Sequence, residues 1–177
     1  HLDKVFTLLI GIVCFSLVAG VVYLINDILD YQRDRLHPRK KNRPIASNRL
    51  KRREAFLAAC VISSIVLPVS FLISAKFFLV IILYLLLQAL YSLFLKHMVL
   101  LDVFAIAFGF SLRILAGACI INVEISSWFM LCGFLLSLFV ALGKRRGELT
   151  MLGSDASAHR GILRKYTIDY VDMLLTV

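Results

Sequence analysis

The chain has 177 residues, of which 60% are hydrophobic and 18% charged, and its mean hydropathy is +0.88. A chain this apolar is not a water-soluble domain, so the composition indicates an integral membrane protein of the all-α class. The formal net charge of +9 would suit a nucleic-acid partner, but most basic residues gather in two segments between apolar runs, which argues against nucleic acid.

Five apolar runs approach the roughly 20 residues that a transmembrane helix needs, and a sixth begins near Tyr166. No linker rich in Pro, Gly or Ser divides them, so we expect one polytopic transmembrane helical bundle over residues 1–177. The chain enters an apolar run soon after His1 and stops at Val177 just after another begins. We therefore expect a fragment of about five to six helices, incomplete at both ends. The five runs cover residues 5–25, 55–74, 77–95, 99–121 and 128–143.

The basic residues predict which loops share one side of the membrane. Ten Lys and Arg residues lie between Arg33 and Arg53, and six lie between Lys144 and Lys165, with Lys96 as one more. If the first run crosses from outside to inside, all seventeen fall on one side, which the positive-inside rule makes cytoplasmic. We expect two cytoplasmic loops, at residues 26–54 and 144–165, and an active site at the cytoplasmic face of the inner (cell) membrane.

Three regularly spaced aspartates follow the first apolar run. Asp27, Asp30 and Asp34 are separated by three and then four residues, which places their carboxylates on one face of a helix that continues from that run. Like charges in this arrangement repel unless a cation neutralises them, and hard oxygen ligands suit Mg²⁺ shared with substrate phosphates. Asn26 adds an amide to the same region. The sequence predicts a magnesium site with Asp27, Asp30 and Asp34 as ligands, and with Asn26, Asp27 and Asp30 as catalytic residues.

A dense basic cluster follows the aspartates directly and includes His37, Lys40 and Arg43. Cationic side chains beside acidic metal ligands are what a metal-bound diphosphate requires. The alternative is a solvated loop that only sets the membrane topology, in which the aspartates would have no purpose. We favour the diphosphate site and predict these three residues as substrate ligands.

Further polar residues lie in or beside the later runs. Asp102 and Arg113 are eleven residues apart, so on one helix they face the same way about 16 Å apart, too far for a salt bridge. Asp102 could pair with Lys96, complete a metal shell or order the site, and Arg113 could meet a lipid phosphate or a carboxylate of another helix. Tyr91 and Lys96 lie at the end of the preceding run, and both are predicted to bind substrate. The alternatives are that Tyr91 only packs against another helix and that Lys96 only extends to the membrane surface.

The second predicted loop carries another group of charges, Lys144, Arg145, Glu148 and Arg160. A diphosphate held at the first loop would need a facing wall, and this is the other charged cytoplasmic segment of any size. The alternative is a charge cluster at a helix end that only anchors the topology. Lys144, Arg145 and Glu148 are predicted substrate ligands.

The aspartate motif resembles the first aspartate-rich motif of the UbiA-type intramembrane prenyltransferase superfamily. Four further segments narrow the resemblance to its decaprenyl-phosphate phosphoribosyltransferase branch, and the similarity spans nearly the whole chain. It implies a UbiA-type bundle with one more helix before His1 and several after Val177. The matching segments are NDILDYQRD at 26–34, HPRKKNRPIA at 37–46, YSLFLKH at 91–97, LLDVFAIAFGFSLRILAGA at 100–118 and ALGKRRGEL at 141–149.

The chain departs in two places from superfamily members that prenylate aromatic rings. It has KRRGEL where they carry a second aspartate-rich motif, and Lys96 follows Tyr91 by five residues where their pattern has four. Both departures weaken an aromatic prenyltransferase assignment and fit the phosphoribosyl branch better.

The resemblance implies a membrane transferase of cell-wall biosynthesis whose cofactor is Mg²⁺. A polyprenyl phosphate would attack C1 of phosphoribosyl diphosphate, with Lys40 and Arg43 on phosphate oxygens and Lys144 and Arg145 on the 5-phosphate or the lipid phosphate. The expected partners are these two substrates and membrane lipid, without nucleic acid, and a homo-oligomer stays open. The alternatives are transfer of a prenyl group from prenyl diphosphate to an aromatic acceptor, and a non-catalytic lipid-binding or transport bundle.

Overall fold

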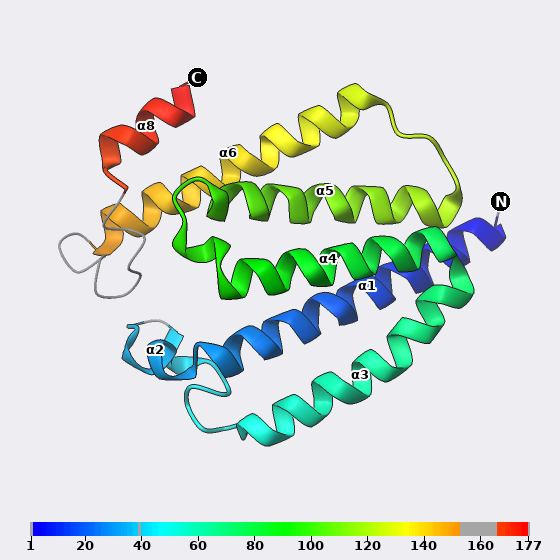
Figure 1. The fold of residues 1–177 in the computed structure, drawn as a ribbon, viewed down its shortest axis with the longest axis horizontal. Coiled ribbons are helices and arrows are strands. Elements are labelled where there is room, and N and C mark those ends of the chain that lie inside the picture. The colour runs from blue at the N-terminus through cyan, green and yellow to red at the C-terminus, as the bar shows by residue number, and fades with distance from the viewer. Residues whose placement is uncertain (1, 39, 153–165, 177) are drawn as a thin grey trace. The chain divides into compact units, whose positions relative to one another are not determined.

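The computed structural model describes residues 2–38, 40–152 and 166–176, which form helices and connecting turns without a strand (Figure 1). This confirms the predicted all-α class. Short 3₁₀ turns occur at Lys40–Asn42 and Leu95–His97. The α-helices are α1 (Leu2–Leu29), α2 (Tyr31–Leu36), α3 (Arg52–Ile73), α4 (Ala75–Leu93), α5 (Leu101–Ile121), α6 (Ser127–Leu152) and α8 (Ile168–Thr176).

Five helical segments are long and apolar enough to cross a membrane, which confirms the five predicted runs. Large apolar side chains on their surfaces are exposed, as in Leu72 and Trp128, where lipid contact is favourable. The last predicted run begins as α8, close to the expected position at Tyr166. The spans are Lys4–Leu29, Arg52–Ile73, Ala75–His97, Leu101–Ile121 and Ser127–Thr150.

One difference concerns the predicted second loop at residues 144–165. Helix α6 continues through Leu152, so the charged KRRGEL segment forms the last turns of a helix and not the start of a loop. Helical hydrogen bonding does not depend on the apolar environment, and a helix continues beyond the apolar stretch wherever no Pro or Gly cap ends it. Residues 153–165, which include Arg160 and most of the predicted second loop, lie outside the described residues.

The chain divides into two compact units, one of residues 1–85 and 115–124, the other of residues 86–114 and 125–177. Helices α4 and α5 each contribute to both units. The division therefore does not coincide with separate stretches of sequence, and a single domain over residues 1–177 stays a prediction.

In the first unit, α1 packs against α3 and also against parts of α4 and α5 (Figure 1). The ring of Phe15 on α1 lies 4.9 Å from that of the buried Tyr84 on α4. A Cβ added to Gly11 would overlap the side chain of Ile120, so the glycine allows α1 to approach the end of α5 closely. These contacts hold the first half of α1 in the unit, and the aspartate motif begins at the opposite end of the same helix.

In the second unit, Val103 of α5 forms a buried cluster with Ala141 and Leu142 of α6. The Phe134 ring of α6 contacts aromatic rings of α5, and a Cβ at Gly133 would crowd the Ile114 side chain. A second buried cluster joins Leu149 at the end of α6 to Tyr166 and to Val171 of α8. The packing fixes the charged end of α6 against both the start of α5 and α8.

Candidate metal and phosphate site

The aspartate motif occupies the end of α1 and the short helix after it. Helix α1 ends at Leu29 and α2 begins at Tyr31, with Asp30 between them at φ −91° and ψ 7°. Helical hydrogen bonds nevertheless continue across this break, because the Asp30 N–H donates to the Asn26 carbonyl at 2.8 Å and the Asp34 N–H donates to the Asp30 carbonyl at 2.9 Å. The chain therefore keeps nearly the helical path that the aspartate spacing predicts.

Two of the three aspartates converge on one cation. The Arg43 Nη1 atom lies 2.6 Å from Asp27 Oδ1 and 2.8 Å from Asp34 Oδ2. The Asp34 side chain is only 5% exposed and that of Asp27 19%, while the Arg43 side chain is 39% exposed. The structure thus holds two carboxylates around a single positive group that solvent reaches more readily than either carboxylate.

The predicted set of three aspartate ligands is not assembled as such. Among the described residues, no three His, Cys, Asp or Glu side chains are grouped closely enough to hold a metal ion. Two carboxylates nevertheless fit Mg²⁺, which usually takes one or two carboxylates and completes its six positions with water and substrate phosphate oxygens. In the structure this position between the two carboxylates is taken by the Arg43 nitrogen. Asp30 and Lys40 carry charges within electrostatic range of Asp27, so the third aspartate belongs to the same cluster.

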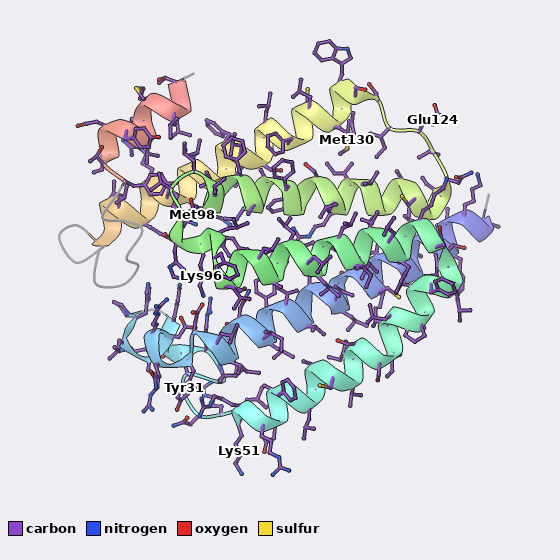
Figure 2. All side chains as sticks on the ribbon, in the orientation of Figure 1. Tyr31, Lys51, Lys96, Met98, Glu124 and Met130 are labelled. Carbon is purple, nitrogen blue, oxygen red and sulfur yellow. The ribbon has the colours of Figure 1, made fainter. Side chains whose placement is uncertain are left out.

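Tyr31, which the sequence analysis did not single out, links α2 to residues that follow the basic segment (Figure 2). Its hydroxyl donates to Asn48 Oδ1 at 2.8 Å and accepts a hydrogen bond from Arg35 Nη1 at 3.1 Å. The guanidinium groups of Arg35 and Arg52 lie 5.5 and 5.0 Å from the centre of its ring, within cation–π range. The sequence signal that could have identified Tyr31 is its position between two aspartates of the motif and close to several arginines.

The predicted phosphate ligands His37 and Lys40 belong to one turn. The Lys40 backbone N–H donates to His37 Nδ1 at 3.3 Å, and both side chains are half-buried. Ile45 and Ala46 are buried just after Arg43 and anchor the end of the basic segment to the first unit. His37 thus shapes the turn that carries Lys40.

In the second unit, the structure pairs Asp102 with Arg145. Asp102 Oδ2 accepts a hydrogen bond from Arg145 Nε at 2.7 Å, and its Oδ1 accepts one from the Tyr166 hydroxyl at 2.8 Å. Arg145 Nη1 also donates to Glu148 Oε2 at 2.8 Å. Asp102 is fully buried and Arg145 is 3% exposed. Asp102 thus has a buried partner from α6 that was not among the options considered from the sequence.

This arrangement changes the reading of Arg145, which we expected to bind a phosphate. A guanidinium buried between two carboxylates is already neutralised, and an incoming anion would have to displace one of them. Lys144, one residue earlier, is exposed on α6 and stays available as a phosphate ligand. Arg146 forms two hydrogen bonds with Asp172 of α8, at 2.5 and 3.0 Å.

The other predicted residues lie along α4 and α5. Tyr91 of α4 is half-buried and within electrostatic range of Arg145. Lys96 is half-buried in the 3₁₀ turn after α4, where Figure 2 marks it. The guanidinium of Arg113 on α5 lies 4.9 Å from the centre of the Phe110 ring. Whether any of the three contacts a substrate stays a prediction.

Among the described residues beyond the spans, Tyr166 and Asp172 have shifted pKa values. Burial is the main cause that raises the pKa of Tyr166, and its hydrogen bond to Asp102 acts in the same direction, so the tyrosine stays protonated well above its usual range. The Arg146 guanidinium lowers the pKa of Asp172 by hydrogen bonding to its ionised form. The protonated Tyr166 holds the segment before α8 at the start of α5, and the ionised Asp172 holds α8 against α6.

Comparisons with known proteins agree with this fold. A model of the UbiA prenyltransferase family matches residues 1–159. The chain is 34% identical over 168 residues to decaprenyl-phosphate phosphoribosyltransferase of Mycolicibacterium smegmatis, covering 95% of this chain and 53% of that protein. It is 35% identical over 170 residues to the Corynebacterium glutamicum protein of the same name, covering 95% and 51%. The chain thus spans about half the length of the curated relatives it matches.

A solved structure shows the same fold. The UbiA homologue from Archaeoglobus fulgidus, bound to DMAPP and Mg²⁺, superposes with a TM-score of 0.84 at 19% identity, over 96% of this chain and 61% of that one.

Proposed function

The chain belongs to the UbiA prenyltransferase family, and from this we propose that it is part of a magnesium-dependent transferase. The enzyme moves 5-phosphoribosyl from phosphoribosyl diphosphate to a polyprenyl phosphate and releases diphosphate. The observation that carries the proposal is the convergence of Asp27 and Asp34 on one cationic position at the end of a membrane-spanning helix. The relatives of similar sequence that are named for this activity support the choice of a sugar diphosphate.

The reaction does not require a covalent bond between the substrates and the protein. An oxygen of the lipid phosphate forms a bond to C1 of the ribose while the bond from C1 to the diphosphate oxygen breaks, and the electron pair leaves with the diphosphate. The phosphate nucleophile is already ionised near neutral pH and needs no general base. The protein must orient the two substrates, exclude water and stabilise the leaving charge.

The first unit supplies the groups for that task. Asp27 and Asp34 hold the metal, and Asp30 adds negative charge beside them. Mg²⁺, when bound, neutralises charge on the diphosphate. Lys40 and Arg43 bind phosphate oxygens next to it, and Asn26 lies one residue before the first aspartate. In the second unit, exposed Lys144 is the residue that we assign to the 5-phosphate or the lipid phosphate.

The membrane orientation is part of the proposal. The basic segment after α1 follows the first membrane-spanning helix, and the basic residues of α6 lie in the last turns of the fifth span. The positive-inside rule places such segments in the cytoplasm, so we place the transfer reaction at the cytoplasmic face of the cell membrane.

The test is a two-substrate assay on membranes containing the full-length protein. Radiolabelled phosphoribosyl diphosphate should be consumed only when polyprenyl phosphate and Mg²⁺ are both present, and Asp27→Asn or Asp34→Asn should lower kcat/KM by roughly 10²- to 10³-fold. Transfer of labelled prenyl groups to an aromatic acceptor would instead establish an aromatic prenyltransferase. Ligand binding or transport that survives both substitutions would point to a non-catalytic bundle.

A further inference from the structure

Arg43 occupies the position between Asp27 and Asp34 that the proposed function assigns to a metal ion. A guanidinium nitrogen and Mg²⁺ cannot both lie between the same two carboxylate oxygens, because each is a cation that needs that space. A metal ion that arrives alone must therefore displace Arg43 and separate two charge-assisted hydrogen bonds. A metal ion that arrives with a diphosphate brings the displaced guanidinium a new anionic partner.

The three side chains are suited to such an exchange. Asp34 is nearly buried and Asp27 largely so, which restricts both carboxylates, whereas the Arg43 side chain is 39% exposed. The backbone beyond Arg43 is fixed, since Ile45 and Ala46 are 2% and 6% exposed. The long arginine side chain can turn away from the aspartates by rotation about its own bonds without movement of the buried backbone.

We propose that Arg43 couples the binding of the metal ion to the binding of the diphosphate. In the free protein it holds the two aspartates together as their counter-ion, so the site has low affinity for a bare metal ion. With a metal-bound diphosphate, Arg43 transfers from the carboxylates to the phosphate oxygens. The two ligands thereby gain a favourable coupling free energy, which by thermodynamic linkage acts equally in both directions. This inference rests on the proposed function.

The experiment uses the purified full-length protein in detergent and two readouts other than turnover. Binding of Mn²⁺ alone is followed by electron paramagnetic resonance, and binding of radiolabelled inorganic diphosphate is measured at saturating Mg²⁺. The variant is Arg43→Gln. Its matched control is Arg53→Gln, which removes the same charge from an exposed position at the start of α3.

Arg43→Gln should bind Mn²⁺ alone more tightly than the unsubstituted protein and bind diphosphate more weakly, each by roughly 10-fold, within the usual range of coupling between sites. Arg53→Gln should leave both affinities unchanged. Arg43→Lys keeps the charge without the planar fork and should give intermediate values, which provides a second variant if the glutamine protein does not fold.

Several outcomes would overturn the inference. They are an unchanged or weaker Mn²⁺ affinity in Arg43→Gln, an equal effect of Arg53→Gln, or a diphosphate affinity that does not change. In these cases the proposed function stands as long as Asp27→Asn and Asp34→Asn still lower the kcat/KM of transfer by the expected factor. If the unsubstituted protein binds neither Mn²⁺ nor diphosphate, the magnesium site of the proposed function fails together with the inference.

Discussion

The carboxylate of Asp102 and the guanidinium of Arg145 lie 2.7 Å apart with almost no exposure to solvent, although the two residues are 43 positions apart in the chain. Burying two charges carries a large desolvation cost, and their attraction offsets it only when hydrogen bonds satisfy the remaining polar atoms. Tyr166 and Glu148 provide these bonds. The network therefore specifies how α5, α6 and the segment before α8 meet in the second unit.

The first prediction concerns removal of one charge of this pair. Asp102→Ala leaves the Arg145 guanidinium without its buried counter-ion and should lower the free energy of unfolding by about 3–5 kcal/mol. Unfolding of the purified protein in detergent, followed by circular dichroism, measures the change. Asp172→Ala is the matched control, because it removes an exposed pair with Arg146 and should change stability little. Equal losses in the two variants would contradict a special role for the buried pair.

The second prediction is a pH dependence that originates at Tyr166. Its pKa is raised in the folded protein, whereas an unfolded tyrosine ionises near pH 10, as in model peptides. The contribution is fully present below about pH 10 and is lost as the pH rises further, because the unfolded chain releases its proton first. Stability should therefore fall above that pH.

Tyr166→Phe should make this alkaline decline shallower. At neutral pH the variant should be less stable by about 1–3 kcal/mol, since the Leu100 N–H and the Asp102 carboxylate both lose a hydrogen-bond partner. Chemical unfolding at a series of pH values between 7 and the alkaline range checks both effects. An identical alkaline slope in the two proteins would show that the Tyr166 hydroxyl does not titrate as described.

The third prediction separates the two functions of Tyr31. Tyr31→Ala removes the ring that contacts Arg35 and Arg52 as well as the bond to Asn48, so the basic segment should lose its fixed position. We expect KM for the diphosphate substrate to rise about 10-fold, with a smaller change in kcat, as loss of about 1.4 kcal/mol of binding predicts.

Tyr31→Phe keeps the ring and loses only the hydroxyl. It should weaken the binding of the diphosphate substrate, read from KM, by about 0.5–1.5 kcal/mol. Tyr23→Ala is the control, since Tyr23 is an exposed residue of α1. Steady-state kinetics of the full-length enzyme provide the measurement. A fall in kcat without a change in KM in the alanine variant would argue against a role in holding the substrate-binding segment.

The fourth prediction compares two glycines of α1. No heavy atom beyond the helix backbone and its neighbours lies within 4 Å of a Cβ built on Gly20, so Gly20→Ala should stabilise the helix by about 0.5–1 kcal/mol. A Cβ on Gly11 overlaps the Ile120 side chain. In Gly11→Ala the Ile120 side chain must therefore move, and the cost of this movement should offset the gain in helix stability. Thermal unfolding of the two variants side by side checks the difference, and a loss of stability in Gly20→Ala would contradict it.

The parts of the fold that were predictable are those set by local chemistry. The thickness of the bilayer dictates the length of an apolar run, and the five spans were found for that reason. The aspartate spacing likewise predicted a shared helical face, and the structure brings Asp27 and Asp34 to one point. The position of Arg43 between them follows from a turn whose path depends on Tyr31, Ile45 and other tertiary contacts that no local pattern reveals.

The second unit shows the same limit. Arg145 resembles a surface cation because it follows an apolar run and lies within a basic triplet. Only the packing of α5 on α6 brings Asp102 to it and converts an expected phosphate ligand into a buried ion pair. Hydropathy likewise could not give the end of α6, because the helix extends past its apolar stretch to Leu152.

The buried Asp102 also bears on the order in which the membrane protein is made. Synthesis proceeds from the N-terminus, so α5 is complete before the ribosome has added Arg145, and Tyr166 follows later still. The turn that leads into α5 has Leu100 at φ 66°, and its N–H also awaits the Tyr166 hydroxyl. Helix α5 is therefore made before either of these two partners of its carboxylate, so its ion pair with α6 can form only after α6 has been synthesised.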